Sequence, residues 1–410
     1  MSVGDNASMR TAIVLLLLAL SSPAFAQQDA ENARRALASI EQALRQRPDD
    51  PTLYFFLARF QAELGDVRAS VAALEKVEAL GEGFLPARTL GFEKVWDDAK
   101  FQEVRARLEA RLPRLDYAPI AFELEDRELL PEGLAYDAPS RSFFLGSTAK
   151  GKIVRVSADG ALTEFASRLD PVLGIAVDSP RRKLYAVSTS SLTEAGRKER
   201  RNAVLVYDVD SRNLLRRVDV PGAIGLNDVA IARGGRVFAS DSGSGAIYEI
   251  PAEGAARLLV PADQIRGSNG LAASADAKRL YVAHSTGLAM VDIDGAGGGV
   301  KRVANKTRET VAAIDGLYEW QGQLIGVQNI TNPGRVILIT LSGDGASITR
   351  VQTLLSHHHN GLDEPTTGAV TERGFHLLAA TGVGHLNDRG TIDKRDTLPK
   401  PSVVRILLPR

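Results

Sequence analysis

The sequence predicts an all-β six-bladed β-propeller preceded by a small N-terminal α-helical, tetratricopeptide-like module. Two observations lead to this fold class. A unit consisting of one lead residue followed by a short apolar strand recurs six times, with a mean period of about 47 residues, which is typical of one four-stranded blade. Helical periodicity also stops at Pro113, and β-rich runs separated by Gly, Asp and Ser continue from there to the C-terminus. We therefore expect a signal peptide over residues 1–26, the helical module over 27–113 and the propeller over 114–410.

The N-terminus has the pattern of a bacterial-type secretory signal. Met9-Arg10 begins a charged region, Ala12 to Leu20 is an apolar run, and Ala24-Phe25-Ala26 is a small-x-small cleavage site before Gln27. The apolar run is too short to span a bilayer. We expect a periplasmic or secreted protein with no membrane span after cleavage, and an uncleaved membrane anchor is the alternative.

The module that follows has helical periodicity. The spacing predicts helices over residues 51–64 and 67–80, with Gly65-Asp66 as the turn between them. The pair resembles a tetratricopeptide repeat at positions that require bulky, small and turn residues, namely Tyr54, Leu57, Ala58, Gly65 and Leu74. Two interpretations stay open, a helical cap that packs on the next domain and a docking platform for a protein partner.

The six lead residues should surround one mouth of the propeller channel, because the innermost strand of each blade starts there. The first and last of them are 235 positions apart, which is five periods of 47 residues. The short strand predicted over residues 120–124 has no blade of its own, so we expect it to complete the last blade and protect the sheet edge. The lead residues are Glu132, Leu173, Asn227, Asn269, Asp315 and Thr367.

Four of these lead residues carry side-chain oxygens that suit a hard cation. Glu132 and Asp315 supply carboxylates, and Asn227 and Asn269 supply amide carbonyls. Ca²⁺ takes about six to eight oxygen ligands and tolerates irregular geometry, so we expect a calcium site, with another divalent cation as a possibility. The alternative is that each side chain only caps a strand or a turn, as Asn and Asp often do.

Composition excludes several classes of function. The 50 basic and 50 acidic residues balance, which gives no electrostatic reason to expect nucleic acid as a partner. The chain contains no cysteine, so disulfides, thiolate metal sites and cysteine nucleophiles are excluded. No Gly-x-Ser-x-Gly motif is present, which argues against a serine hydrolase of the α/β type.

The motifs at the lead positions resemble those of a known family. Pro131-Glu132-Gly133-Leu134, Leu226-Asn227-Asp228, Ser268-Asn269-Gly270-Leu271 and Asp315-Gly316 are similar in order and spacing to motifs of the SMP-30/gluconolactonase family and the related paraoxonases. The resemblance covers roughly residue 118 to the C-terminus. It implies a calcium-dependent propeller hydrolase of lactones or related esters, in which Glu132, Asn227, Asn269 and Asp315 hold the metal.

Two residues are candidates for proton transfer. His284 ends the second strand of the fourth repeat and has an ordinary pKa near neutrality, so it could serve as the general base that activates water. The resemblance allows Asp315 to be both a metal ligand and the base or nucleophile. Leu173 stands where paraoxonases carry a histidine, and Asp228 is expected to support Asn227 from outside the ligand set.

The leading prediction is therefore a calcium-dependent lactonase or esterase that acts on a small-molecule substrate. The competing prediction is a non-catalytic propeller whose calcium is structural and whose helical module binds a partner. His357-His358-His359 is expected to be a loop, because adjacent side chains on an extended segment point in opposite directions. Two charged insertions, residues 197–201 and 385–400, are expected to be solvated loops or lids over the mouth.

Overall fold

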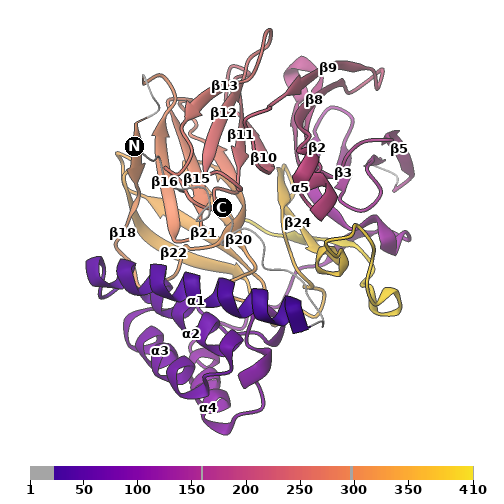
Figure 1. Cartoon of the computed structure of the whole chain (residues 1–410). Coiled ribbons are helices and arrows are strands. Elements are labelled where there is room, and N and C mark those ends of the chain that lie inside the picture. The colour runs from indigo at the N-terminus through magenta and orange to yellow at the C-terminus, as the bar shows by residue number, and fades with distance from the viewer. Residues whose placement is uncertain (1–22, 158–159, 296–298, 410) are drawn as a thin grey trace, which may run out of the picture. The chain divides into compact units, whose positions relative to one another are not determined.

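The computed structural model describes residues 23–157, 160–295 and 299–409, and the chain forms two compact units. One unit contains the chain up to Leu112 together with the short segments Arg308–Thr310 and Ile330–Pro333. The other contains the remainder of the chain from Pro113. Figure 1 shows the first unit as helices and the second as a ring of strands.

Among the described residues, the helical unit contains four α-helices and two short 3₁₀ turns. Helices α2 and α3 have the bounds that the hydrophobic spacing predicts, and each begins at an aspartate whose carboxylate accepts a backbone N–H, Asp50 from Thr52 and Asp66 from Ala69. Gly65 ends α2 with φ +82°, a left-handed conformation that favours glycine. The elements are α1 (Pro23–Gln46), α2 (Pro51–Leu64), α3 (Val67–Leu80), η1 (Arg88–Leu90), η2 (Glu93–Val95) and α4 (Ala99–Glu109).

Aromatic side chains make the core of this unit, with Phe55 fully buried and 5.3 Å from Phe84 between ring centroids. Residues 1–22, which hold most of the predicted signal peptide, lie outside the described residues, and α1 includes the predicted cleavage site at Ala24-Phe25-Ala26. Within the described part of the chain, no helix is long and apolar enough to cross a membrane. Export and the tetratricopeptide likeness therefore stay predictions.

The second unit is a six-bladed β-propeller, which confirms the predicted fold class. Every blade is an antiparallel sheet. Its strands lie side by side in order from the channel to the outside of the ring. The first three blades contain β2 (Pro131–Asp137), β3 (Ser142–Ser147), β4 (Ile153–Val156) and β5 (Leu162–Ala166); β6 (Val172–Asp178), β7 (Lys183–Thr189), β8 (Asn202–Asp208) and β9 (Leu214–Asp219); and β10 (Leu226–Ile231), β11 (Val237–Asp241), β12 (Ala246–Ile250) and β13 (Arg257–Val260).

The last three blades follow the same plan, with one addition. The short strand β18 (Ala304–Asn305) runs parallel to the outer strand of blade five. The strands are β14 (Leu271–Ala273), β15 (Arg279–His284), β16 (Gly287–Asp292) and β17 (Val300–Arg302); β19 (Ile314–Trp320), β20 (Gln323–Gln328), β21 (Arg335–Leu341) and β22 (Ser347–Leu355); and β23 (Gly368–Thr371), β24 (Gly374–Ala380), β25 (Ser402–Ile406) and β1 (Ile120–Glu123). Further short helices lie in the connections, namely η3 (Arg127–Leu129), η4 (Ser179–Arg181), α5 (Glu194–Glu199), η5 (Val383–His385) and η6 (Arg395–Thr397).

Strands in the middle of a blade are apolar on both faces because each blade packs between two others. In β8, Ala203, Leu205 and Tyr207 pack against blade one. The alternate residues Val204 and Val206 pack against blade three. Since successive side chains of a strand point to opposite faces, one continuous apolar run supplies two hydrophobic interfaces. This explains why these strands lack the alternating pattern of a half-exposed sheet.

The ring closes at blade six with a strand from before blade one. Strand β1 pairs with β25, so Ile120 lies opposite Val404. This confirms the role predicted for residues 120–124. The core on the far side of this junction joins Leu134 and Leu145 of blade one to Leu378 and Val403 of blade six. Closure therefore depends on hydrogen bonds within blade six and on apolar packing between blades six and one.

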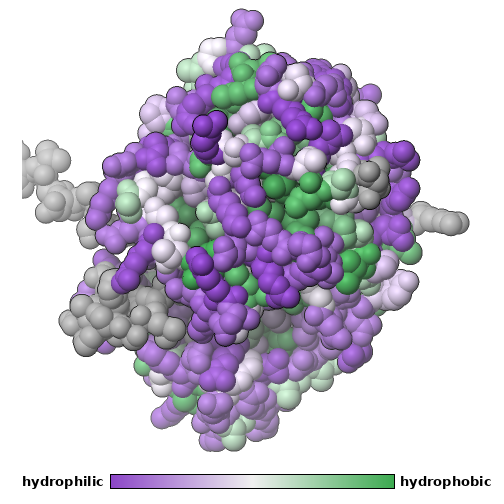
Figure 2. Space-filling model, turned by 90° about the vertical axis from the view of Figure 1, so that its right-hand side faces the viewer, coloured by the Kyte–Doolittle hydropathy of each residue, from purple (hydrophilic) through white to green (hydrophobic). Residues whose placement is uncertain are grey.

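On the face drawn in Figure 2, hydrophobic groups lie among hydrophilic ones. The large hydrophobic side chains that are exposed lie mainly on outer strands of blades, for example Leu162 on β5 and Leu214 and Leu215 on β9. Scattered exposure of this kind is normal for a folded protein.

Truncation at the closing interface should destabilise the propeller. Leu378 is fully buried, so Leu378→Ala is expected to lower the free energy of unfolding by about 2–5 kcal/mol through lost burial and a cavity. Urea unfolding followed by circular dichroism measures this change. Leu407→Ala, at a side chain that is 66% exposed, is the matched control and should change stability little. Equal stability of both variants would contradict the closure described here.

Candidate functional site

The lead residues lie where the inner strands are interrupted by bulges. The pairing of the inner strand with its neighbour shifts between Pro131 and Gly133, between Val172 and Ile175, between Leu226 and Val229, and between Ile314 and Leu317. A bulge leaves a residue outside the ladder and re-aims its side chain. Glu132, Leu173, Asn227 and Asp315 each fall within one of these four shifts.

Two glycines allow neighbouring inner strands to approach closely beside the lead residues. A Cβ at Gly174 would lie 2.6 Å from Cα of Asp228, and a Cβ at Gly270 would clash with the backbone oxygen of Asp315. Real Cβ atoms do not approach other atoms so closely, so only glycine permits this spacing of blades two and three and of blades four and five. The glycine that follows a lead residue thus tightens the ring at the site.

Glu132 is the most strongly perturbed acid of the site. Its side chain is 8% exposed, and its Oε2 atom is buried with no hydrogen-bond partner among the described residues. Burial, followed by repulsion from Asp315 and Asp228, raises the pKa of the Glu132 carboxyl well above its usual range. A buried carboxylate oxygen without a partner is costly in free energy, so this atom is suited to a cation ligand.

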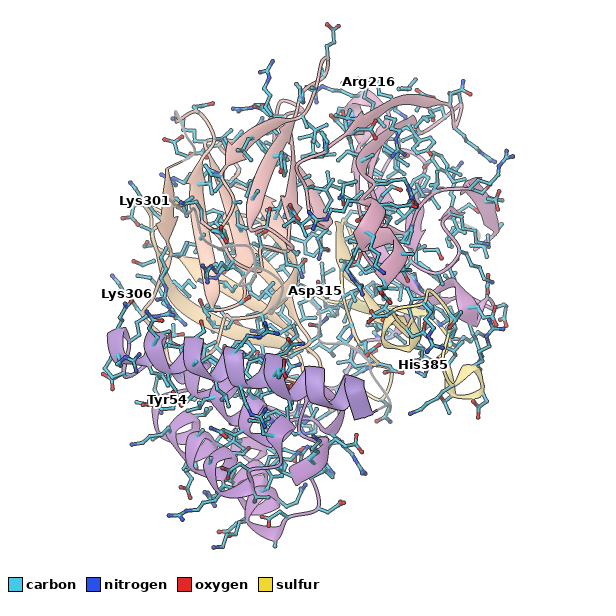
Figure 3. The ribbon with its side chains drawn as sticks, viewed as in Figure 1. Tyr54, Arg216, Lys301, Lys306, Asp315 and His385 are labelled. Atoms are coloured by element: carbon cyan, nitrogen blue, oxygen red, sulfur yellow. The ribbon has the colours of Figure 1, made fainter. Side chains whose placement is uncertain are left out.

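Asp315 is held by two amide groups. Its Oδ1 accepts a hydrogen bond from Asn269 Nδ2 at 2.8 Å, and its Oδ2 accepts one from Asn329 Nδ2 at 2.6 Å. Burial raises the pKa of Asp315 to about 6, against the lowering effect of these two hydrogen bonds. Figure 3 shows Asp315 towards the middle of the strand ring. The two amides fix the carboxylate plane and direct it at the site.

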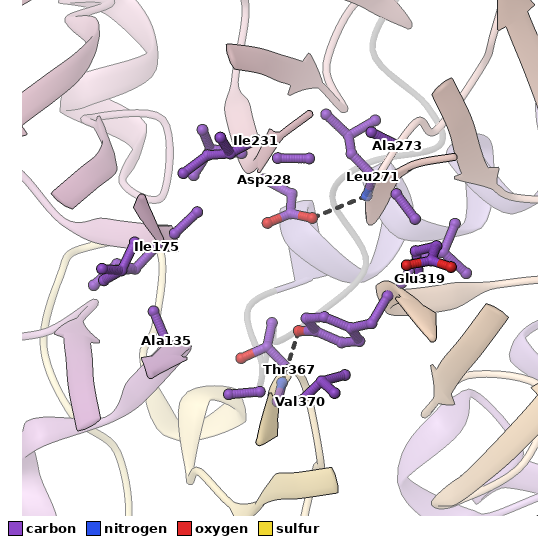
Figure 4. Close-up of a pocket in the computed structure, with 18 of the residues that line it drawn as sticks. Ala135, Ile175, Asp228, Ile231, Leu271, Ala273, Glu319, Thr367 and Val370 are labelled. Carbon is purple, nitrogen blue, oxygen red and sulfur yellow. Dashed lines mark hydrogen bonds between the residues drawn. The ribbon is translucent and has the colours of Figure 1, made fainter. Parts of the chain in front are cut away.

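Asp228 adds a third carboxylate to the site. The sequence predicted only that it supports Asn227, whereas in the structure it lines the channel cavity. Burial, with a smaller contribution from Asp315, raises the pKa of Asp228 to about 7. Its Oδ2 accepts the Leu271 backbone N–H at 3.0 Å. The side chain lies at the inner end of a cavity of about 580 Å³ that all six inner strands line, as Figure 4 shows. Asp228 therefore presents its carboxylate to the channel beside the lead residues.

The loop before Asn227 is fixed by two buried polar side chains. Both carboxylate oxygens of Asp241 accept backbone N–H groups, from Ile224 at 2.8 Å and from Gly225 at 2.7 Å. Asn202 accepts the Leu226 N–H at 3.1 Å. These bonds account for three consecutive amides, so they determine where Asn227 enters the ring. Asp241 thus supports the site from the loop that precedes Asn227.

Two residues of the site were missed by the sequence reasoning. Asn329 directly follows β20, and its only sequence signal is that position at the end of a second strand. Tyr318 lies three residues after Asp315, and its hydroxyl accepts the Gly368 backbone N–H at 2.7 Å. Burial, then the charge of Asp228, raises the pKa of Tyr318, which keeps the phenol neutral and able to donate.

His284 lies at the same end of the propeller as the lead residues, because β15 runs antiparallel to β14. Its Nδ1 accepts a hydrogen bond from the Thr286 backbone N–H at 3.3 Å. Leu173 is 6% exposed and packs into the apolar core between blades two and three. That position offers no proton-transfer group.

The remaining predicted features take structural positions. The Thr367 hydroxyl donates a hydrogen bond to the backbone oxygen of Glu132 at 2.6 Å, so this lead residue of blade six holds the inner strand of blade one. In the histidine tract, His358 Nδ1 contacts Ser356 Oγ at 3.0 Å and His359 Nε2 contacts the backbone oxygen of Ala118 at 2.9 Å. The two rings are directed to separate partners within the propeller.

The donor set fits a hard divalent cation. It combines carboxylates on Glu132 and Asp315, amide oxygens on Asn227 and Asn269, and a buried Glu132 oxygen that lacks a hydrogen bond. Oxygen-only donors with excess negative charge suit Ca²⁺, and Mg²⁺ or Mn²⁺ less well. A cation would also remove the repulsion that raises the pKa of Glu132.

The sequence profile of the SMP-30/Gluconolactonase/LRE-like region matches residues 130–353, which include the four predicted metal ligands. The chain belongs to this family. Among curated proteins, no sequence matches the chain at a significant level.

Solved structures resemble this member of the SMP-30/gluconolactonase family at low identity. A gluconolactonase from Xanthomonas campestris is 15% identical, covering 72% of this chain and 91% of its own, with a TM-score of 0.48. The allergen Mala s 1 from Malassezia sympodialis is 13% identical, covering 72% and 96%, with a TM-score of 0.54. Virginiamycin B lyase from Staphylococcus aureus is 11% identical, covering 70% and 98%, with a TM-score of 0.49. At these identities the likeness shows the fold alone.

Without a cation, the stability contributed by the acidic cluster should fall as the pH rises. Asp315 and Asp228 have pKa values of about 6 and about 7 in the folded chain, against 3.8 for an ordinary aspartate. The folded state therefore binds protons more tightly than the unfolded state, and ionisation between about pH 4 and pH 7 favours unfolding. We expect the difference in unfolding free energy between calcium-loaded and chelated protein to grow across this range. Urea titrations at several pH values test it, and a constant difference would contradict the prediction.

Asn329 should increase the calcium affinity of the site by orienting Asp315, without itself being a metal ligand. Asn329→Ala removes the hydrogen bond to Asp315 Oδ2, and loss of such a supporting bond typically weakens metal affinity about 10- to 100-fold. Isothermal titration with calcium measures the change. Asn213→Ala, at an exposed turn on blade two, is the matched control and should leave affinity unchanged. Unchanged affinity in Asn329→Ala would show that Asp315 is oriented by other groups.

Proposed function

We propose that this protein is a calcium-dependent hydrolase of a lactone or related ester. The observation that carries the proposal is the buried, unpartnered Glu132 Oε2 near the carboxylates of Asp315 and Asp228, in a chain that belongs to the SMP-30/gluconolactonase family. Glu132, Asn227, Asn269 and Asp315 would hold the cation. Bound there, the cation would polarise the carbonyl oxygen of the substrate as a Lewis acid.

The protein's own groups supply the remaining chemistry. Water attacks the carbonyl carbon, the ring or ester C–O bond breaks, and the leaving alkoxide takes up a proton. Asp315 is the candidate acceptor of the proton from water, because Asn269 and Asn329 fix both of its oxygens. His284, at the same end of blade four, is the second candidate for this role. Tyr318 keeps a neutral hydroxyl beside the acids.

A panel of lactones and aryl esters, assayed with calcium and with a chelator, tests the proposal. We expect turnover that the chelator abolishes and that added calcium restores. Protein that binds calcium but turns over no substrate would favour the competing function, a non-catalytic propeller with structural calcium that binds a partner. Protein that binds no divalent cation would refute both functions at this site.

The substitution Asp315→Asn separates catalysis from folding. It keeps the size of the side chain and removes the charge, so we expect turnover to fall at least about 100-fold, as for loss of a general base, with little change in unfolding midpoint. Steady-state kinetics and urea unfolding measure the two effects. Asp219→Asn, at a side chain 65% exposed on the outer strand of blade two, is the matched control. Full activity in Asp315→Asn would leave His284 as the candidate base.

A further inference from the structure

Two insertions leave the propeller at the end where the lead residues lie. Residues 190–201, which contain α5, connect β7 to β8 in blade two, and residues 381–401 connect β24 to β25 in blade six. Both begin where a second strand ends. Because second strands run antiparallel to inner strands, that end is also where the inner strands begin. The two insertions therefore rise from the mouth that holds Glu132 and Asn227.

The insertions contact each other although blade one lies between their blades. The Glu194 backbone N–H donates to the backbone oxygen of Asp388 at 2.8 Å. The side chains of Arg197 and Asp388 form an ion pair at 3.3 Å. A Cβ built on Gly390 would lie 3.0 Å from Cγ2 of Thr193. The contact is thus made by backbone and side chains together and is centred on Asp388.

Each insertion is firmly held where it leaves the propeller. In blade two, Ser190 Oγ donates to the backbone oxygen of Gly196 at 2.8 Å and accepts the Arg201 N–H at 2.9 Å. In blade six, Glu364 accepts the Gly384 N–H at 2.7 Å, and Arg127 donates to the backbone oxygen of Leu398 at 2.6 Å. The roots of both insertions are therefore fixed by hydrogen bonds to their own surroundings.

The contact between the insertions is weaker than the hydrogen bonds that anchor each insertion where it leaves the propeller. The Asp388 side chain is 51% exposed, and that of Arg197 is 24% exposed. An ion pair open to solvent contributes little, because water screens the charges and two long side chains must be ordered. The structure thus has two anchored arms joined by a contact that is open to solvent.

The arms cover a definite part of the mouth. The blade-six arm packs near Leu130, two residues before Glu132, since a Cβ on Gly382 would lie 3.2 Å from Leu130 Cδ2. The blade-two arm approaches Gly225, two residues before Asn227, where an added Cβ would lie 3.1 Å from Ser191 Oγ. Together they span the part of the ring that runs from Glu132 past Leu173 to Asn227.

We propose that these two arms form a lid over the site, latched at Asp388, that opens for substrate and limits the size of the lactone or ester that can be turned over. The inference rests on the proposed function for its catalytic consequence. A lid of this kind excludes bulk water during reaction and commonly controls entry and release. Arg197 and Asp388 are therefore specificity-determining residues that act through the lid and not on the reacting atoms.

A reversible lock tests the lid directly. The chain has no cysteine, so Thr193→Cys with Gly390→Cys can form only one disulfide within the chain, between positions where a Cβ on residue 390 would lie 3.0 Å from Thr193 Cγ2. We expect oxidation to lower kcat/KM for an alkyl-substituted lactone such as γ-dodecalactone at least about tenfold, as for a blocked lid, and dithiothreitol to restore it. γ-Butyrolactone should be affected less. The single-cysteine variants are the controls. Equal activity of oxidised and reduced enzyme on both lactones would overturn the proposal.

An opening variant covers the case in which cysteine at Gly390, where φ is +76°, disturbs folding. Asp388→Ala removes the ion pair with Arg197 and should raise kcat/KM for γ-dodecalactone relative to γ-butyrolactone. Lys198→Ala, which removes only the exposed pair with Glu194, should leave this ratio unchanged. A ratio that is the same in wild type and Asp388→Ala would overturn the lid as a determinant of size.

Hydrogen–deuterium exchange distinguishes failure of the lid from failure of the proposed function. Asp388→Ala should raise deuterium uptake in residues 190–201 as well as in 383–400, because the arms protect each other. This coupling needs no substrate. If wild-type protein shows no turnover and Asp388→Ala still raises uptake in both arms, the hydrolase is refuted and the latch is supported. Uptake that rises in 383–400 alone would overturn the latch, whatever the activity.

Discussion

The site is governed by the burial of three carboxylates at one end of an apolar channel. Burial raises the pKa of Glu132, Asp228 and Asp315, and the charge of Asp315 adds to the effect on the other two. The donors present are neutral, two asparagine amides on Asp315 and a backbone N–H on Asp228. Neutral donors orient carboxylates but do not cancel their charge. A bound cation resolves this conflict, and it would couple metal binding to both stability and catalysis.

The strand architecture puts these acids where they are. Inner strands that continued as regular ladders would direct the lead side chains between the blades, whereas the bulges at four of the lead positions release them from pairing. Glycines beside them let adjacent blades approach until the side chains converge. Hydrogen bonds from Asp241 and Asn202 then fix the loop that carries Asn227. The precision of the site comes from this framework and not from the acids alone.

One fold can carry different chemistries, so what is particular to one propeller lies in the residues at its mouth and in the connections around it. In this chain the longest connections at that end belong to blades two and six, which are separated by blade one and yet contact each other through Asp388. The inner strands thus supply the candidate metal ligands, and the insertions supply a contact across the mouth between blades two and six.

The sequence by itself determined the fold class, the helix bounds at residues 51–64 and 67–80, the six lead positions and the strand that closes the ring. These features depend on local periodicity and on a repeat, both of which one chain displays. Only the tertiary structure decided that Asn329 holds Asp315, that Asp228 faces the channel, and that the two insertions meet. Each of those features depends on residues from separate strands or from blades that are not neighbours. No local sequence pattern encodes how far apart such residues lie in the folded chain. The ring could be predicted because it repeats, whereas its supporting bonds occur once each and arise only when the blades close.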